Sequence, residues 1–208
     1  MKLYLTKTPR IIQRIFKNYT WRFAVKNKVL FLTFDDGPTP EITNWTLDLL
    51  KKHKAKATFF CIGKNVIQEP EIYHRIINEG HRVGNHTHNH KNGAKTTIKN
   101  YISNFLEAEK NLHNTSKLFR PPYGKIKKKQ ALKILNLGYK IIMWDVLSAD
   151  FDQSISKEKC LKNVLKNTKP GSIIVFHDSI KASEKLKYVL PKVLEYYTEK
   201  RYKFSTIT

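Results

Sequence analysis

The chain has 208 residues, which is enough for one well-buried core and too few for two ordinary domains. Hydrophobic residues make up 40% and charged residues 27%, a globular composition that argues against disorder, and no apolar stretch reaches the roughly 20 residues of a membrane-spanning helix. The net charge of +22 comes from lysines spread along the whole chain. This distribution predicts attraction to an anionic cell-envelope surface and no specific nucleic-acid binding.

Residues 1–28 are expected to form a basic segment that packs on the body of the fold. Lys7, Arg10 and Arg14 interrupt its apolar runs, and it lacks the apolar stretch and small-residue cleavage site of a signal peptide. With no signal peptide visible, the location is cytoplasmic by default, or the cell envelope if the protein is exported by another route. The remaining residues, 29–208, are expected to form a single domain.

From residue 29 onward, strand-like and helix-like segments alternate without a linker or repeat, which is typical of an α/β fold. The strand-like segments are apolar runs, as expected of strands buried on both faces. We predict strands over residues 29–34, 57–63, 81–85, 117–123, 139–145, 171–178 and 202–208. We predict helices over residues 40–50, 69–80 and 97–113, before Gly138, around Cys160 and Leu165, and over 184–200. Seven such units favour either an open doubly wound sheet or a closed barrel.

Polar residues of unusual kinds follow five of the predicted strands. They are Asp35 and Asp36, His86 and His90, Arg120 to Tyr123, Trp144 and Asp145, and His177 and Asp178. Both candidate architectures place their chemistry at the carboxyl ends of the strands. We therefore expect these five separated segments to converge on one site.

A cluster of histidines, NHTHNH, occupies residues 85–90. In a helical turn, His86 and His90 would share one face and could hold one cation, whereas in an extended segment His88 would join them. A polar loop whose histidines only form hydrogen bonds is the alternative. Two histidines with one carboxylate leave a metal open positions for water and substrate. The pattern predicts one divalent metal ion, with zinc as the first choice and cobalt, nickel or manganese as alternatives.

The adjacent carboxylates of Asp35 and Asp36 suggest two separate roles. Side chains diverge at a strand end, so one carboxylate can ligate the metal while the other takes a proton from water. An Asx-type turn before Gly37 accounts for one aspartate and not for the second. At the same edge, His177 is a candidate general acid, and Arg120 can hold the base by a bidentate contact.

A resemblance to a known family is carried by five motifs in fixed order: TFDDGP, HTHNH, RPPYG, WDVLSADF and VFHD. The chain resembles the polysaccharide deacetylases with a NodB-homology domain, carbohydrate esterase family four, from about Val29 to its C-terminus. The resemblance implies a distorted seven-stranded (β/α) barrel in one domain, residues 29–208. It also implies divalent-metal hydrolysis of N-acetyl groups of an N-acetylglucosamine polymer or oligomer, peptidoglycan or chitin-like. We expect the protein to be a monomer. The alternatives are an O-acetyl xylan esterase of the same fold, a non-haem iron oxygenase, and a catalytically weak carbohydrate- or envelope-binding protein.

The resemblance also assigns roles to single residues. The metal-ligand positions are those of Asp36, His86 and His90. The catalytic positions are those of Asp35 as base, His177 as acid, Arg120 as the residue that orients the base, and Tyr123 as the backbone N–H donor to the oxyanion. The expected substrate-binding residues are Trp144, Phe151 and Pro122.

One motif departs from the family pattern. The first aspartate of the family's fourth motif, which supports the catalytic histidine, is replaced here by Leu147. Either Asp145 or Asp150 must then take over this support, or the pKa of His177 is set in another way. We include Asp150 among the catalytic residues on this ground.

Overall fold

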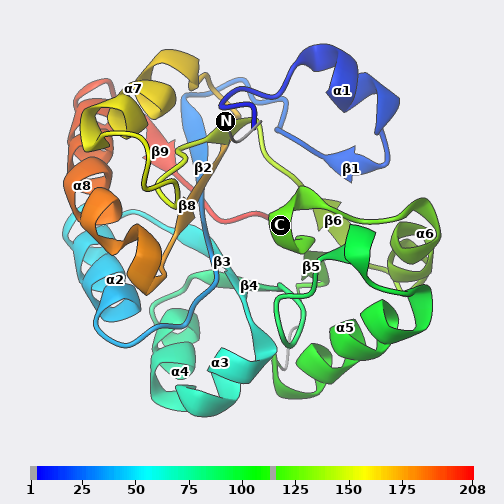
Figure 1. Ribbon diagram of the computed structural model, residues 1–208. Helices are drawn as coiled ribbons and strands as arrows, with labels where there is room; N and C mark the ends of the chain where they lie inside the picture. The colour runs from blue at the N-terminus through cyan, green and yellow to red at the C-terminus, as the bar shows by residue number, and fades with distance from the viewer. Residues whose placement is uncertain (1–3, 113–115) are drawn as a thin grey trace.

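Parallel strands form the centre of the fold, and helices surround them (Figure 1). The computed structural model describes residues 4–112 and 116–208. Its strands are β1 (Tyr19–Thr20), β2 (Val29–Asp35), β3 (Ala57–Cys61), β4 (Arg82–Asn85), β5 (Leu118–Phe119), β6 (Lys140–Ile142), β7 (Val146–Leu147), β8 (Ile173–His177) and β9 (Lys203–Phe204). Its helices are α1 (Arg10–Ile15), α2 (Ile42–Lys52), α3 (Gly63–Gln68), α4 (Pro70–Asn78), α5 (Ile98–Leu112), α6 (Lys128–Asn136), α7 (Lys157–Asn167) and α8 (Ser183–Glu199), with 3₁₀ turns η1 (Gly93–Lys95), η2 (Pro122–Gly124) and η3 (Ile180–Ala182). None of the described helices combines the length and hydrophobicity needed to cross a membrane.

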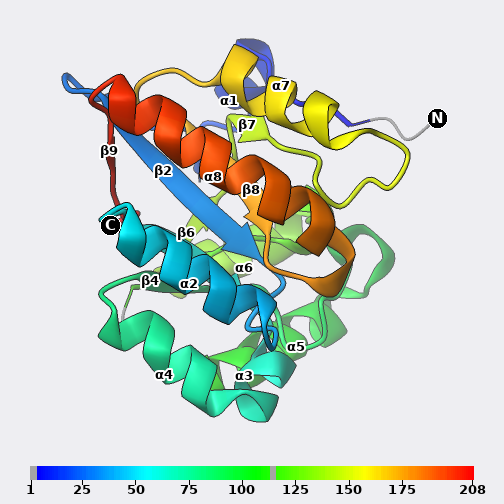
Figure 2. The same cartoon turned by 90° about the vertical axis from the view of Figure 1, so that its left-hand side faces the viewer.

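The strand order is β1-β6-β5-β4-β3-β2-β8-β7, with β9 paired to the start of β2. Within β2, successive side chains point to opposite faces of the sheet. Leu32 and Phe34 are fully buried in the main core, under the layer of α2, α8 and α7 that faces the viewer in Figure 2. Burial of each such side chain contributes about 1.5–3 kcal/mol to stability. Thr33 and Asp35 lie on the opposite, inner face, so the same alternation carries a carboxylate to the inner rim of the sheet.

The two ends of the sheet are joined by the N-terminal segment. Tyr19 and Thr20 pair with β6 at one end, and Lys7 forms a bridge with Val146 of β7 at the other. The backbone N–H of Leu147 also donates to the Thr6 carbonyl at 3.0 Å. The curled sheet is therefore a distorted barrel, as the family resemblance predicts, and part of its closure comes from residues before β2.

The structure corrects the number and length of the predicted strands. The described residues form nine strands rather than seven, because β1 lies in the N-terminal segment and the predicted strand over 139–145 stops at Ile142, with Val146–Leu147 as a separate strand. The strand predicted over 117–123 ends at Phe119, since Pro121 and Pro122 have no N–H for the ladder. The predicted helix over 97–113 corresponds to α5, and its predicted last residue, His113, lies outside the described residues.

Candidate metal and catalytic site

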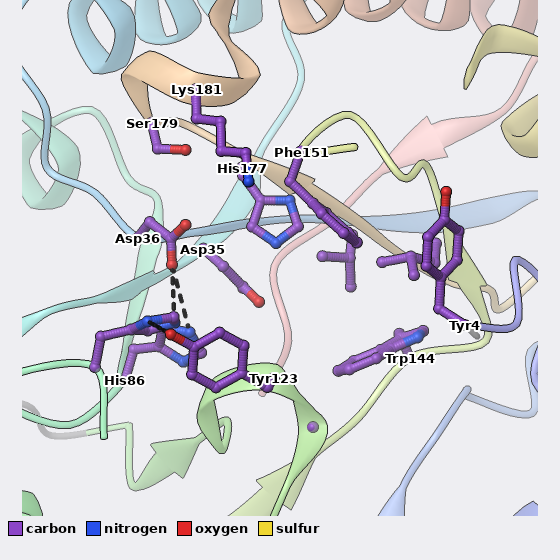
Figure 3. A pocket seen from close by; sticks show the side chains of 14 residues that line it. Tyr4, Asp35, Asp36, His86, Tyr123, Trp144, Phe151, His177, Ser179 and Lys181 are labelled. Atoms are coloured by element: carbon purple, nitrogen blue, oxygen red, sulfur yellow. Dashed lines mark hydrogen bonds and ion pairs between the residues drawn. The ribbon is translucent and has the colours of Figure 1, made fainter. Parts of the chain in front are cut away.

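A pocket of about 490 Å³ opens where the carboxyl ends of β2, β4, β5, β6 and β8 meet (Figure 3). The predicted site residues that line it are Asp35, Asp36, His86, His90, Tyr123, Trp144, Phe151 and His177. Arg120 and Asp150 are fully buried and contact lining residues from behind. Pro122, predicted to bind substrate, is instead buried within η2 and does not line the pocket. The five strand ends therefore converge, although the side chains of Pro122, Asp145 and Asp178 do not line the pocket.

The Asp35 carboxylate is held by a buried arginine. Nη1 of Arg120 donates to Oδ1 of Asp35 at 2.7 Å, and both side chains are almost fully buried. The other guanidinium contacts go to the Thr33 hydroxyl and to the carbonyls of Ile142 and Met143. The predicted bidentate contact is wrong, because only Nη1 donates to the carboxylate, while Nε and Nη2 donate to the two backbone carbonyls. Arg120 nevertheless stays charged, since burial lowers its pKa from a very high starting value.

Asp36 points away from Asp35 because the chain turns sharply between them. Asp36 has a φ of 83°, in the left-handed region that non-glycine residues seldom adopt. Asp178 fixes this turn from below: its carboxylate accepts the N–H of Gly37 at 3.1 Å and the hydroxyl of Thr43 at 2.6 Å. A Cβ at Gly37 would lie 2.0 Å from the Asp178 carboxylate, so only glycine fits. The two carboxylates are thereby separated onto different sides of the strand end.

The histidines are brought together by a loop that is neither helical nor extended. Thr87 and His90 both have positive φ, at 62° and 51°, and the Asn85 side chain accepts the Thr87 N–H. The two imidazole rings of His86 and His90 lie 5.0 Å apart, and His88 is outside the group. The predicted pair is brought together, but its helical-turn geometry is wrong, since Thr87 and His90 have left-handed backbone angles.

Three ligand atoms face one another in this loop. Nε2 of His86 and Nε2 of His90 lie 3.7 Å and 3.2 Å from Oδ1 of Asp36, and one ligand atom from each residue lies within 4.8 Å of the others. Nδ1 of His86 is 2.7 Å from the Arg120 carbonyl, which can only accept, so Nδ1 carries the proton and Nε2 presents a lone pair. Burial lowers the pKa of His86 well below its usual range and also lowers the pKa of His90.

These properties test whether a cation suits the site. Nε2 of His86 aims its lone pair at a carboxylate oxygen, Oδ1 of Asp36, that is buried without a hydrogen-bond partner among the described residues. Acceptors grouped in this way repel one another unless a cation lies between them. Two imidazoles and one carboxylate are also a donor set that divalent metals accept. The triad of Asp36, His86 and His90 therefore fits one divalent metal ion.

His177 is held by Asp150 on the opposite wall of the pocket. Nδ1 of His177 lies 2.7 Å from Oδ1 of Asp150, and the other carboxylate oxygen accepts the His177 backbone N–H at 2.8 Å. Burial of the ring lowers the pKa of His177, but the charge and hydrogen bond of Asp150, with the charges of Asp36 and Asp35, outweigh this and raise the pKa to about 9. Of the two candidates for support of His177, Asp150 is therefore the one that contacts it. Asp145, the other candidate, is paired with Lys7 at 2.6 Å and with Ser172.

The family comparison agrees with this geometry. The polysaccharide deacetylase family profile matches residues 23–142. The chain belongs to this family. The family resemblance is thereby confirmed. The matched region contains the first three of the five motifs and begins six residues before the predicted domain start at residue 29.

Individual members of the polysaccharide deacetylase family match most of the chain. A peptidoglycan-N-acetylglucosamine deacetylase of Bacillus cereus is 41% identical over 152 residues, which are 71% of this chain but only 55% of that relative. A second deacetylase of the same description and organism is 33% identical over 193 residues, 91% of each protein. The solved structure of the Bc1960 peptidoglycan N-acetylglucosamine deacetylase, in complex with 4-naphthalen-1-yl-N-oxidanyl-benzamide, is similar with a TM-score of 0.87 and 34% identity. That similarity covers 96% of this chain and 95% of the other.

Several residues of this polysaccharide deacetylase site were not predicted. They are Tyr4, Gly124, Leu147, Val175, Ser179 and Lys181 in the pocket wall. Ser179 and Lys181 directly follow the His177 motif, so an extension of the strand-end argument by a few residues could have found them. Tyr4 carries no local signal, because it reaches the pocket only through pairing of the N-terminal segment with β7.

Proposed function

We propose that the protein is a metal-dependent hydrolase that removes N-acetyl groups from N-acetylglucosamine units of peptidoglycan. The observation that carries the proposal is the grouping in one pocket of a cation triad, a buried carboxylate and a charged histidine. Hydrolysis of an amide needs these three elements: an electrophile, a base for water and an acid for the leaving amine. The names of the Bacillus cereus relatives support the choice of substrate.

Asp36, His86 and His90 would hold the metal, and zinc is our first choice because it accepts imidazole and carboxylate ligands with positions left open. When bound, such an ion polarises the acetyl carbonyl and lowers the pKa of water. Asp35 accepts the proton of the attacking water, and Arg120 keeps its carboxylate oriented toward the pocket. Other metals, cobalt, nickel or manganese, remain candidates because the same donor set accepts them.

The remaining steps use groups on the other side of the pocket. The backbone N–H of Tyr123 takes part in no hydrogen bond among the described residues and would donate to the developing acyl oxyanion. His177, charged through Asp150, donates a proton to the sugar nitrogen as the C–N bond breaks. The water oxygen ends in acetate and the sugar nitrogen leaves as an amine, so protons and electron pairs balance. Trp144 and Phe151 give this pocket apolar walls for the substrate.

Peptidoglycan is preferred over chitin as the substrate on grounds of charge. Peptidoglycan carries carboxylates on its muramic acid units and peptides, whereas chitin is neutral. The chain has a net charge of +22. Lys181 lines the pocket and forms no ion pair with another described residue. Such a basic surface raises the local concentration of an acidic polymer.

The function is tested by acetate release from peptidoglycan, chitin oligomers and acetylxylan. We expect release from the N-acetylated substrates, loss of release after treatment with a chelator, and recovery when zinc, cobalt, nickel or manganese is added back singly. Release from acetylxylan alone would instead indicate an O-acetyl esterase. Substrate binding without acetate release at any metal would indicate a binding protein, and a requirement for oxygen would indicate an oxygenase.

Replacement of Asp150 by asparagine should shift the pH dependence of the reaction. The pKa of His177 is raised to about 9 in the presence of Asp150, so the acid form persists above neutral pH. Without that carboxylate, burial of the ring lowers the pKa, and the proton is lost at lower pH. We expect the alkaline limb of kcat/KM to move to lower pH and activity at pH 8 to fall about 10²-fold. A pH profile from 5 to about 10 measures both effects.

Asp145→Asn is the matched control for Asp150→Asn. It also removes a buried carboxylate, but Asp145 contacts Lys7 and Ser172 rather than His177. The alkaline limb of this control should coincide with that of the wild type. An unshifted limb in Asp150→Asn would show that His177 does not supply the proton.

A further inference from the structure

We propose that Tyr4 forms part of the substrate-binding groove, where it recognises the sugar unit next to the one that is deacetylated. Tyr4 belongs to the N-terminal segment, outside the family match that begins at residue 23. The inference rests on the proposed function, since it takes the substrate to be an N-acetylglucosamine-containing glycan. It adds a specificity-determining residue that the family motifs do not contain.

The position of Tyr4 in the pocket suits a second sugar. Figure 3 shows Asp36 and His86 at one end of the pocket and Tyr4 and Trp144 at the other. The volume of about 490 Å³ lies within the range of pockets that enclose ligands much larger than an acetyl group. A glycan whose acetyl group reaches the triad would therefore extend toward the aromatic end.

The ring of Tyr4 is fixed in orientation before any ligand arrives. Its hydroxyl donates to Oδ2 of Asp152 at 2.7 Å, and its ring meets the Phe151 ring edge-on, with centroids 5.5 Å apart. Burial and the bond to Asp152 raise the pKa of Tyr4, so the phenol stays neutral. A sugar ring has one apolar face of C–H groups, which packs well on a flat and rigid aromatic surface.

Contacts of the residues after Tyr4 hold the N-terminal segment against the chain around Trp144. Nζ of Lys7 pairs with Asp145 at 2.6 Å, and the hydroxyl of Thr8 donates to the carbonyl of Trp144 at 2.8 Å. The N–H of Thr8 also donates to the Asp145 carbonyl at 3.0 Å. Residues 4–8 therefore pack against residues 144–145. This contact fixes the position of Tyr4 relative to Trp144, and the two rings form two walls of one groove.

The test compares Tyr4→Ala with the wild type on N-acetylglucosamine and on a peptidoglycan tetrasaccharide. We expect KM for the tetrasaccharide to rise about five-fold or more, as for loss of one aromatic contact, with kcat changed less than about two-fold. Activity on the monosaccharide should stay unchanged, because it cannot reach both ends of the pocket. Tyr4→Trp should restore a KM near that of the wild type.

Leu5→Ala is the control, since Leu5 is 53% exposed and does not line the pocket. Equal KM values for Tyr4→Ala and the wild type on the tetrasaccharide would overturn the proposal. An equal loss on both substrates would also overturn it, because that pattern indicates a general structural role. Calorimetric binding of the tetrasaccharide to an Asp35→Asn background, with and without Tyr4→Ala, tests the contact even if the wild type releases no acetate. If the wild type releases no acetate, the proposed function fails. Weaker tetrasaccharide binding on addition of Tyr4→Ala would still support the contact.

Discussion

Replacement of Asp36 or His86 by alanine should abolish both metal binding and acetate release. Each side chain supplies one of three lone-pair donors that face one another in the pocket. With one donor gone, the remaining two cannot enclose a cation, and the electrophile that activates the acetyl group is lost. We expect kcat/KM to fall at least about 10³-fold, which corresponds to the several kcal/mol that a metal ion supplies. Elemental analysis after dialysis and an acetate assay measure the two losses.

His88→Ala is the matched control for the ligand substitutions. His88 lies in the same loop, two residues from each ligand histidine, but does not belong to the triad. This variant should keep stoichiometric metal and most of the activity. Full activity of Asp36→Ala on peptidoglycan would exclude the proposed metal site.

Replacement of Asp35 by asparagine should remove activity while metal binding is retained. Asparagine has nearly the same shape and can still accept a hydrogen bond from Arg120, but it cannot take a proton from water. We expect kcat to fall about 10²- to 10⁴-fold. The variant should also be less stable by about 3–5 kcal/mol, because the buried guanidinium loses its only carboxylate partner among the described residues. Acetate assays, metal content and thermal unfolding separate the three effects.

Asp48→Asn makes the same chemical change at an exposed ion pair with Arg75. Since Asp48 is largely exposed, this control should lose no more than about 1 kcal/mol and no activity. Loss of metal in Asp35→Asn would mean that the roles of the two neighbouring aspartates are exchanged. Retained activity would mean that Asp35 is not the base.

The convergence of the site could be predicted because it follows from a general property of parallel sheets. Apolar runs mark the strands, and chemistry gathers where they end. The residues Asp35, His86 and His177 were located in this way, and the structure brings them to one pocket. The family motifs, rather than the spacing, distinguished the role of Asp36 from that of its neighbour.

The parts that could not be predicted depend on long-range pairing or on unusual backbone angles. The strand Tyr19–Thr20 is too short to leave an apolar pattern and exists because β6 accepts it as a partner. The left-handed conformation of Thr87 and His90 has no glycine to signal it, so the histidine loop was expected to be helical or extended. The choice between Asp145 and Asp150 was likewise decided only by their partners in space.

Arg120 contributes to the site through two different parts of the same residue. Its carbonyl accepts the ring N–H of His86, and its guanidinium holds Asp35. The positions of the base and of one metal ligand therefore both depend on Arg120, which directly follows β5. A substitution that shifted this strand end would therefore displace the base and the ligand together.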